Sequence, residues 1–150
     1  MKLYLARHGE YQTENLNSLT PLGKQHIMRM ASFLKPLNIK LSTIFHSGKL
    51  RAQQTAELLA DAFHCDGQPV ARNGIDPTDE IPAIYDEISH WDEDTLLVGH
   101  LPFMGKLTSK LITGDENHDI VMFYPGTLVC LEKTGSGYWS IDWVIRPELV

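Results

Sequence analysis

The chain has 150 residues, of which 43% are hydrophobic and 21% charged, a balance that suits one globular domain rather than a disordered segment. Its formal net charge of −6 argues against a general nucleic-acid binder, which would need a basic face to displace counterions. No apolar run approaches the roughly 20 residues of a membrane span, and the N-terminus becomes charged too early for a signal peptide.

The two cysteines, Cys65 and Cys130, show neither close pairing nor the spacing of metal ligands. We interpret them as free thiols in a reducing compartment. These features together predict a cytoplasmic monomer in which residues 1–150 form a single domain, with no nucleic-acid or membrane partner.

Short apolar runs alternate with helical patterns along the first part of the chain. Residues 3–5 predict a short buried strand. Thr20 and Pro21 predict a helix start, because threonine caps free backbone N–H groups and proline suits the first helical position. Pro36 should end that helix. Its apolar residues fall mostly on one predicted face: Leu22, Met30, Phe33 and Leu34.

The clearest amphipathic helix follows a second predicted strand at residues 43–46. Its polar face carries Gln53, Gln54 and Glu57. Residues 65–73 are ambiguous, with a short strand possible at 69–71. The positions that recur at helical spacing on the other face are Ala52, Thr55, Ala56, Leu59, Ala62 and Phe63.

The rest of the chain predicts two helices and then a β-rich tail. A helix is expected over 78–89, a buried strand over 95–98, and a helix over 103–112 that ends at Gly114. Strands are expected at 121–123, 127–132 and 138–144, with a turn at 135–137. This order predicts an α/β three-layer sandwich whose mostly parallel sheet carries antiparallel C-terminal strands.

Three segments with polar side chains follow predicted strands. They are Arg7-His8-Gly9, the segment from Ser47 to Arg51, and Gly99-His100. In an open α/β sheet, ligands bind just beyond the carboxyl ends of the strands. We therefore expect two arginines and two histidines at one rim.

That set of residues suits a phosphoryl group. Two guanidinium forks can match phosphate oxygens and offset their charge, and Arg51 would also lie at a helix N-terminus. A histidine with an unperturbed pKa of about 6.5 offers a neutral nucleophile at neutral pH. Gly9 and Gly99 would let the backbone approach the ligand. Each residue alone more often has a structural role, so spacing by itself does not establish catalysis.

Four segments resemble the motifs of the histidine phosphatase superfamily, also called the phosphoglycerate mutase-like family. The matches come in the family's order and span about two-thirds of the chain. They are Leu5-Ala6-Arg7-His8-Gly9-Glu10, Thr20-Pro21-Leu22-Gly23-Lys24-Gln25, the stretch from Ser47 to Thr55, and Val98-Gly99-His100-Leu101-Pro102.

The resemblance implies a role for each matching residue. His8 would attack phosphorus and become phosphohistidine, Arg7, Arg51 and His100 would bind the phosphoryl oxygens, and water would release phosphate. It implies no metal or other cofactor, and the sequence shows no metal-ligand cluster. Ser47 either touches phosphate or caps the following helix, and we favour the cap. The family often has proline where Gly48 stands, a change expected to affect loop rigidity.

The short chain lacks the insertions of sugar-phosphate mutases and resembles the SixA-type branch, the phosphohistidine phosphatases that act on signalling phosphocarrier domains. Where larger members carry a Leu-x-Glu acid, this chain has Ile75-Asp76-Pro77. Because imidazole leaves far more readily than an alkoxide, we expect a preference for phosphorus–nitrogen substrates. Glu10, Asp76 and Asp79 stay open as proton donors.

Two other functions compete with this hypothesis. One is a phosphatase for small phosphate esters, and the other is a phosphate-binding module without catalysis. Among the remaining histidines, His46 could line the pocket, His26 suits packing or surface, and His64, His90 and His118 are expected to be exposed.

Overall fold

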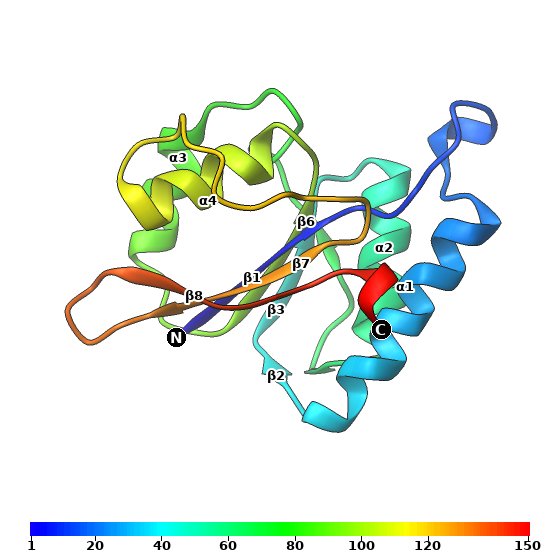
Figure 1. Cartoon of the computed structure of the whole chain (residues 1–150), viewed down its shortest axis with the longest axis horizontal. Coiled ribbons are helices and arrows are strands. Elements are labelled where there is room, and N and C mark those ends of the chain that lie inside the picture. Colours follow the sequence, from blue (N-terminus) through cyan, green and yellow to red (C-terminus); the bar gives the residue numbers. More distant parts are fainter.

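The computed structural model describes all residues from 1 to 150 and is built on a six-stranded sheet (Figure 1). Its strand order is β5-β3-β6-β1-β7-β8. The four strands from β5 to β1 run parallel, and β7 and β8 are antiparallel. The strands are β1 Lys2–Arg7, β3 Thr43–His46, β5 Val70–Ala71, β6 Thr95–Gly99, β7 Leu128–Lys133 and β8 Trp139–Ile145.

Four helices cover the two faces of this sheet, α1 and α2 on one and α3 and α4 on the other (Figure 1). Strand β1 shows why, because its side chains alternate between two apolar clusters. Tyr4 packs with the α1 and α2 side, and Leu5 with the α3 and α4 side. The predicted three-layer sandwich is confirmed. The helices are α1 Pro21–Leu34, α2 Leu50–Ala60, α3 Ile81–Ser89 and α4 Phe103–Thr113.

Smaller elements complete the fold. Strands β2 (Lys40–Leu41) and β4 (His64–Cys65) form a separate two-stranded pair, which the sequence did not predict because two residues show no periodicity. Short 3₁₀ turns lie at residues 15–17, 35–37 and 147–149. None of the helices combines the length and apolar character that a bilayer-spanning segment needs.

Helix α1 starts as predicted but buries a different face. The Thr20 hydroxyl accepts the Gly23 N–H at 2.9 Å, which confirms the cap. Leu22 and Phe33 are 50% and 53% exposed, so their assignment to the buried face is wrong. At 100° per residue the buried stripe runs through positions 23, 27, 30, 31 and 34 instead, and it joins Met30 and Leu34 to Ile27.

Two later predictions also need correction. Residues 121–123 form no strand; they cross the end of the sheet as a loop in which Phe123 is buried and Met122 is 73% exposed. Helix α3 begins at Ile81 rather than residue 78, because the Asp79 carboxylate accepts the Asp76 N–H and closes a turn in front of it. The remaining predicted strands and helices occur within three residues of their expected bounds.

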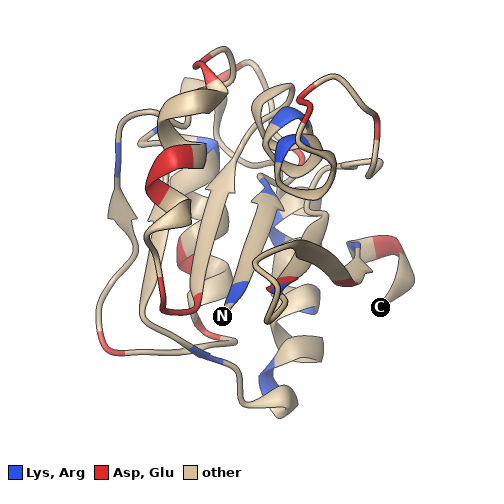
Figure 2. Ribbon diagram, turned by 90° about the vertical axis from the view of Figure 1, so that its left-hand side faces the viewer, with Lys and Arg blue, Asp and Glu red and all other residues tan.

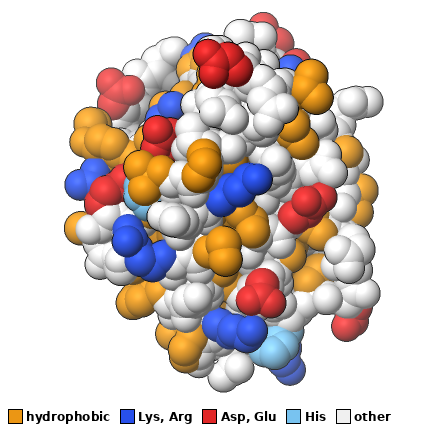
Figure 3. Space-filling model, turned by 90° about the vertical axis from the view of Figure 1, so that its right-hand side faces the viewer, with side chains coloured by type: hydrophobic (Ala, Val, Ile, Leu, Met, Phe, Trp, Pro, Cys, Tyr) orange, Lys and Arg blue, Asp and Glu red, His pale blue; other side chains and the backbone are white.

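Acidic and basic side chains are interspersed over the fold. Figure 2 shows both signs on the helices and loops around the sheet, and Figure 3 shows charged and hydrophobic side chains mixed on the opposite side of the molecule. The side drawn in Figure 3 presents no broad basic face.

The loop after β1 crosses α1 at Gly23, and this contact gives a first prediction. A Cβ at Gly23 would lie 2.2 Å from the Glu10 carbonyl oxygen, two residues beyond His8. We expect Gly23→Ala to lower the free energy of unfolding by about 1–3 kcal/mol, because backbone must move. Urea denaturation measures this change in the free energy of unfolding.

Gly105→Ala in α4 is the matched control. A Cβ there would approach nothing nearer than Leu101 Cδ2 at 3.7 Å. It should raise stability by about 0.5–1 kcal/mol, since alanine loses less backbone entropy in a helix. Equal effects of the two substitutions would refute the role of the Glu10 contact.

Candidate active site

The carboxyl ends of β1, β6 and β3 bring the predicted residues to one rim. Arg7 is in register with Gly99, and His46 with Val98, so the residues that follow these strands are neighbours. The rings of His8 and His100 have centroids 5.0 Å apart at an interplanar angle of 54°. Both are nearly inaccessible, at 4% and 1% exposure. Two histidines 92 positions apart therefore share one buried site.

His8 is held in one tautomer. Its Nδ1 lies 2.8 Å from the Gly9 carbonyl oxygen, which can only accept, so Nδ1 carries the proton and Nε2 the free lone pair. Burial lowers the pKa of His8 to about 4; the Gly9 hydrogen bond opposes this shift, and the charges of Arg51 and Arg7 add to it. At neutral pH the ring is uncharged, as an attacking nitrogen must be.

A glycine turn just before β7, the strand next to β1, fixes the His8 backbone. The Gly126 N–H donates to the His8 carbonyl at 3.0 Å, and the His8 N–H donates to the Gly99 carbonyl at 3.0 Å. Gly126 has φ +82°, and a Cβ there would lie 2.8 Å from Pro147 Cγ. Only glycine fits this position without strain.

His100 is oriented by Ser47. The Ser47 Oγ lies 2.6 Å from His100 Nε2 and accepts the Lys49 N–H at 3.3 Å. With the serine hydroxyl donating to Nε2, Nδ1 of His100 is a buried donor without a protein partner. Burial lowers the pKa of His100 to about 3, with the nearby charges of His8 and Arg51 acting the same way. The predicted helix cap is wrong, because α2 begins after Lys49 with no side-chain cap.

The two arginines converge on the same site. Arg7 Nη1 donates to the Phe123 carbonyl at 2.7 Å, and the Nε atoms of Arg7 and Arg51 are both buried without a protein partner. Burial lowers the pKa of Arg7, an effect that Tyr11 opposes. Buried donors are rarely left unpaired, so two guanidinium Nε atoms and His100 Nδ1 mark a place for an anion.

Helix α2 connects Arg51 to the loop after His8 through Thr55, predicted on its apolar face, and Gln54, predicted on its polar face. The Gly9 N–H donates to Thr55 Oγ1 at 3.0 Å, and that hydroxyl donates to the Arg51 carbonyl at 2.8 Å. Gln54 Oε1 accepts the Leu19 N–H at 2.8 Å. The sequence feature that could have indicated this role is a polar residue, Thr55, within the apolar face of the predicted helix.

The glycines at the rim have a packing reason. A Cβ at Gly9 would lie 3.1 Å from Ile27 Cγ1, and one at Gly99 would lie 2.4 Å from Met104 Cε. At both glycines the position that a Cβ would take is therefore already crowded by a protein side chain. Gly48 has φ +88°, which proline cannot adopt, so this loop turns differently from one with proline there.

The other candidates lie outside this set. His46 is buried and its Nδ1 accepts the Gly48 N–H at 3.0 Å, so it orders the loop that carries Ser47. His26 is half-buried, and the three remaining histidines are exposed as expected. Neither His8 nor His100 is hydrogen-bonded or ion-paired to Glu10, Asp76 or Asp79.

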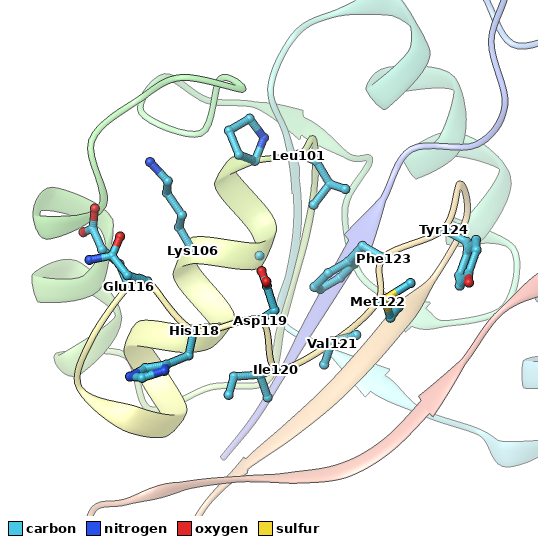
Figure 4. A pocket seen from close by; sticks show the side chains of 13 residues that line it. Leu101, Lys106, Glu116, His118, Asp119, Ile120, Val121, Met122, Phe123 and Tyr124 are labelled. Carbon is cyan, nitrogen blue, oxygen red and sulfur yellow. The ribbon is translucent and has the colours of Figure 1, made fainter.

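A groove of about 630 Å³ adjoins the site between the start of α4 and the loop of residues 116–124 (Figure 4). Leu101 follows His100 at one end, and Phe123 supplies the carbonyl that holds Arg7. Leu101, Met122 and Tyr124 are 37%, 73% and 41% exposed, so the groove has an apolar rim. Lys106, Glu116, His118 and Asp119 add polar groups to its lining.

The sequence is similar to a protein-family model and to two known proteins. The family model of the histidine phosphatase superfamily (branch 1) matches residues 3–73. An uncharacterized protein of Picosynechococcus is 30% identical over 130 residues, covering 80% of this chain and 78% of that protein. The phosphohistidine phosphatase SixA of Escherichia coli is 22% identical over 155 residues, covering 98% and 94%.

The fold agrees as well. A structure of the protein histidine phosphatase SixA complexed with tungstate superimposes with a TM-score of 0.87 at 21% identity, covering 99% of each chain. The fold is thus the phosphoglycerate mutase-like one that the motifs implied. The chain is a phosphatase and belongs to the histidine phosphatase superfamily. Within that superfamily it is of the SixA type.

Proposed function

We propose that the chain hydrolyses the phosphorus–nitrogen bond of phosphorylated histidine on a signalling phosphocarrier protein, through a covalent phospho-His8 intermediate. The observation that carries this proposal is a neutral His8 with Nε2 free, beside three buried donors of Arg7, Arg51 and His100 that have no protein partner. The similarity to a phosphohistidine phosphatase supports the same substrate class.

In the first step, His8 Nε2 attacks phosphorus as the bond to the substrate imidazole breaks. The bonding pair leaves with that imidazole, which is neutral if the phosphohistidine was protonated. Positive charge develops on the His8 ring, and the Gly9 carbonyl that accepts from Nδ1 stabilises it. The forks of Arg7 and Arg51, with His100 Nδ1, stabilise the equatorial phosphoryl oxygens.

In the second step, water attacks the phospho-His8 intermediate. The P–N bond breaks, the electron pair returns to Nε2, and inorganic phosphate leaves. Ser47 acts through His100, whose Nε2 it holds, and Gly9 acts through its carbonyl. No metal or other cofactor takes part in this scheme.

The site supports a protein substrate and a single functional unit. Residues of the first half and His100 of the second complete one site, so we propose residues 1–150 as one domain that works as a monomer. The adjoining groove, with its apolar rim, offers room for the part of a substrate protein that surrounds its phosphohistidine. The free thiols of Cys65 and Cys130 support a cytoplasmic setting in signal transduction.

A phosphatase for small phosphate esters is the alternative function. It needs an acid beside the leaving oxygen, and Asp76 is the candidate, because the carbonyl of neighbouring Ile75 lies 3.6 Å from the Cβ position of Gly99. A binding module without catalysis is the other alternative. His8 argues against it, since a binder needs no nucleophile.

Phosphate release from three substrates tests the proposal. The wild type is given a phosphohistidine-bearing phosphocarrier domain, a phosphoserine peptide and an aryl phosphate. We expect kcat/KM to be at least about 10²-fold higher for phosphohistidine than for phosphoserine, because no acid assists an alkoxide. Comparable turnover of phosphoserine would favour the ester phosphatase, and its loss in Asp76→Asn would then identify the acid. Binding of phosphate without release from any substrate would favour the binding module.

A further inference from the structure

Tyr11 is a residue at the site that the motifs do not explain. It follows Glu10, and its backbone forms an isolated antiparallel bridge with Leu19. Gln54 of α2 in turn holds the Leu19 N–H. The loop that carries Tyr11 is thus fixed to the helix that carries Arg51, although the side chain is 39% exposed.

The Tyr11 ring contacts both the nucleophile and the second arginine. Its centroid lies 5.2 Å from that of His8, nearly edge to face at 81°. The guanidinium carbon of Arg51 lies 4.8 Å from the same ring centroid. One aromatic side chain therefore spans the two groups that must meet the phosphoryl group together.

The two arginines are anchored by different means. Arg7 donates one N–H, from Nη1, to the Phe123 carbonyl, whereas the Arg51 guanidinium makes no hydrogen bond within the protein. An aromatic face attracts a guanidinium without using any of its N–H donors and without neutralising its charge. A carboxylate in the same place would take donors and cancel the charge that phosphoryl oxygens require.

We propose that Tyr11 is a positioning residue that holds the Arg51 guanidinium beside His8 in the geometry of the transferring phosphoryl group. This inference rests on the proposed function and deepens it. Because Tyr11 acts on the group that meets developing charge, it affects the transition state more than the bound substrate.

Binding of vanadate, which mimics the five-coordinate transition state, tests the role. We expect Tyr11→Leu to weaken vanadate binding about tenfold, inorganic phosphate binding less, and to lower kcat with little change in KM. Tyr11→Phe keeps the ring and should stay within about twofold of wild type. In an Arg51→Ala background, Tyr11→Leu should have no further effect on vanadate binding, because the group it positions is gone.

The control is Tyr85→Leu, which removes another tyrosine ring with a cation over it; Lys110 Nζ lies 5.2 Å from the centroid of this half-buried ring. It should leave vanadate binding as in wild type. Additive effects of Tyr11→Leu and Arg51→Ala, or a Tyr11→Phe variant as weak as Tyr11→Leu, would overturn the proposal. Tyr11→Met serves if Tyr11→Leu does not fold. Vanadate binding needs no turnover, so an error in the proposed substrate would leave this result standing.

Discussion

Replacing His8 by alanine is expected to lower kcat for phosphate release by on the order of 10⁴-fold or more, since the covalent route loses its nucleophile. The structure gives His8 Nε2 no competing partner, because Nδ1 holds the proton that bonds to Gly9. Rapid quenching of the wild type into alkali should trap phosphoryl label on the protein, because phosphohistidine survives base and is lost in acid. The alanine variant should trap none.

His26→Ala is the control, because this histidine is half-buried on α1 and makes no hydrogen bond or ring contact with His8 or His100. It should keep the rate of the wild type. A His8→Ala protein that retains a tenth of the activity, with a wild-type melting curve, would rule out the covalent role.

Arg7→Ala has the second largest expected effect, a loss of about 10²–10³-fold in kcat, the usual cost of removing a buried transition-state donor. Arg7 is fixed by its bond to the Phe123 carbonyl, so its remaining N–H groups are aimed before substrate arrives. Arg7→Lys should recover little of the loss, because an ammonium is a point charge on a flexible stem and has no planar fork. Steady-state kinetics with a phosphohistidine-bearing phosphocarrier domain measures both variants.

Arg72→Ala is the matched control for Arg7. This arginine is also shielded, lies over the Phe45 ring and pairs with Glu87, but it belongs to the edge of the sheet after β5. Its loss should reduce stability and leave kcat within about twofold. An Arg7→Lys enzyme as fast as the wild type would mean that charge alone, rather than the fork, is needed.

The sequence predicted the fold where its signals were periodic or local. The Thr20 cap, the strand at residues 43–46 and the stop at Gly114 were all encoded within a few positions. Residues 121–123 looked like a strand because they are apolar, but no strand of the sheet accepts them there. Whether a segment forms a strand depends on its pairing with residues that are distant in the sequence, and local strand propensity carries no information about that pairing.

The sequence predicted which residues form most of the candidate site. It did not predict the hydrogen bonds that orient them. Strand ends and motifs singled out His8, Arg51 and His100. The bonds that orient them join residues far apart in the chain, as when Thr55 receives the Gly9 N–H. Tyr11 was missed because a lone tyrosine after a motif carries no spacing signal, and its role depends on where Arg51 comes to lie.

The central place of β1 in the sheet has a consequence for the protein's synthesis. This strand precedes the other strands of the sheet in the chain, yet its two neighbours are β6, which begins at Thr95, and β7, which ends at Lys133. At ribosomal speeds, roughly ten seconds separate the appearance of His8 from that of its last supporting strand. Until β6 has been made, the nascent chain carries an apolar strand with both edges unpaired, and the edge that β7 covers stays unpaired until residue 133 has been added. A chain that stops before residue 100 therefore lacks His100, and one that stops before residue 128 lacks the strand that covers the second edge of β1.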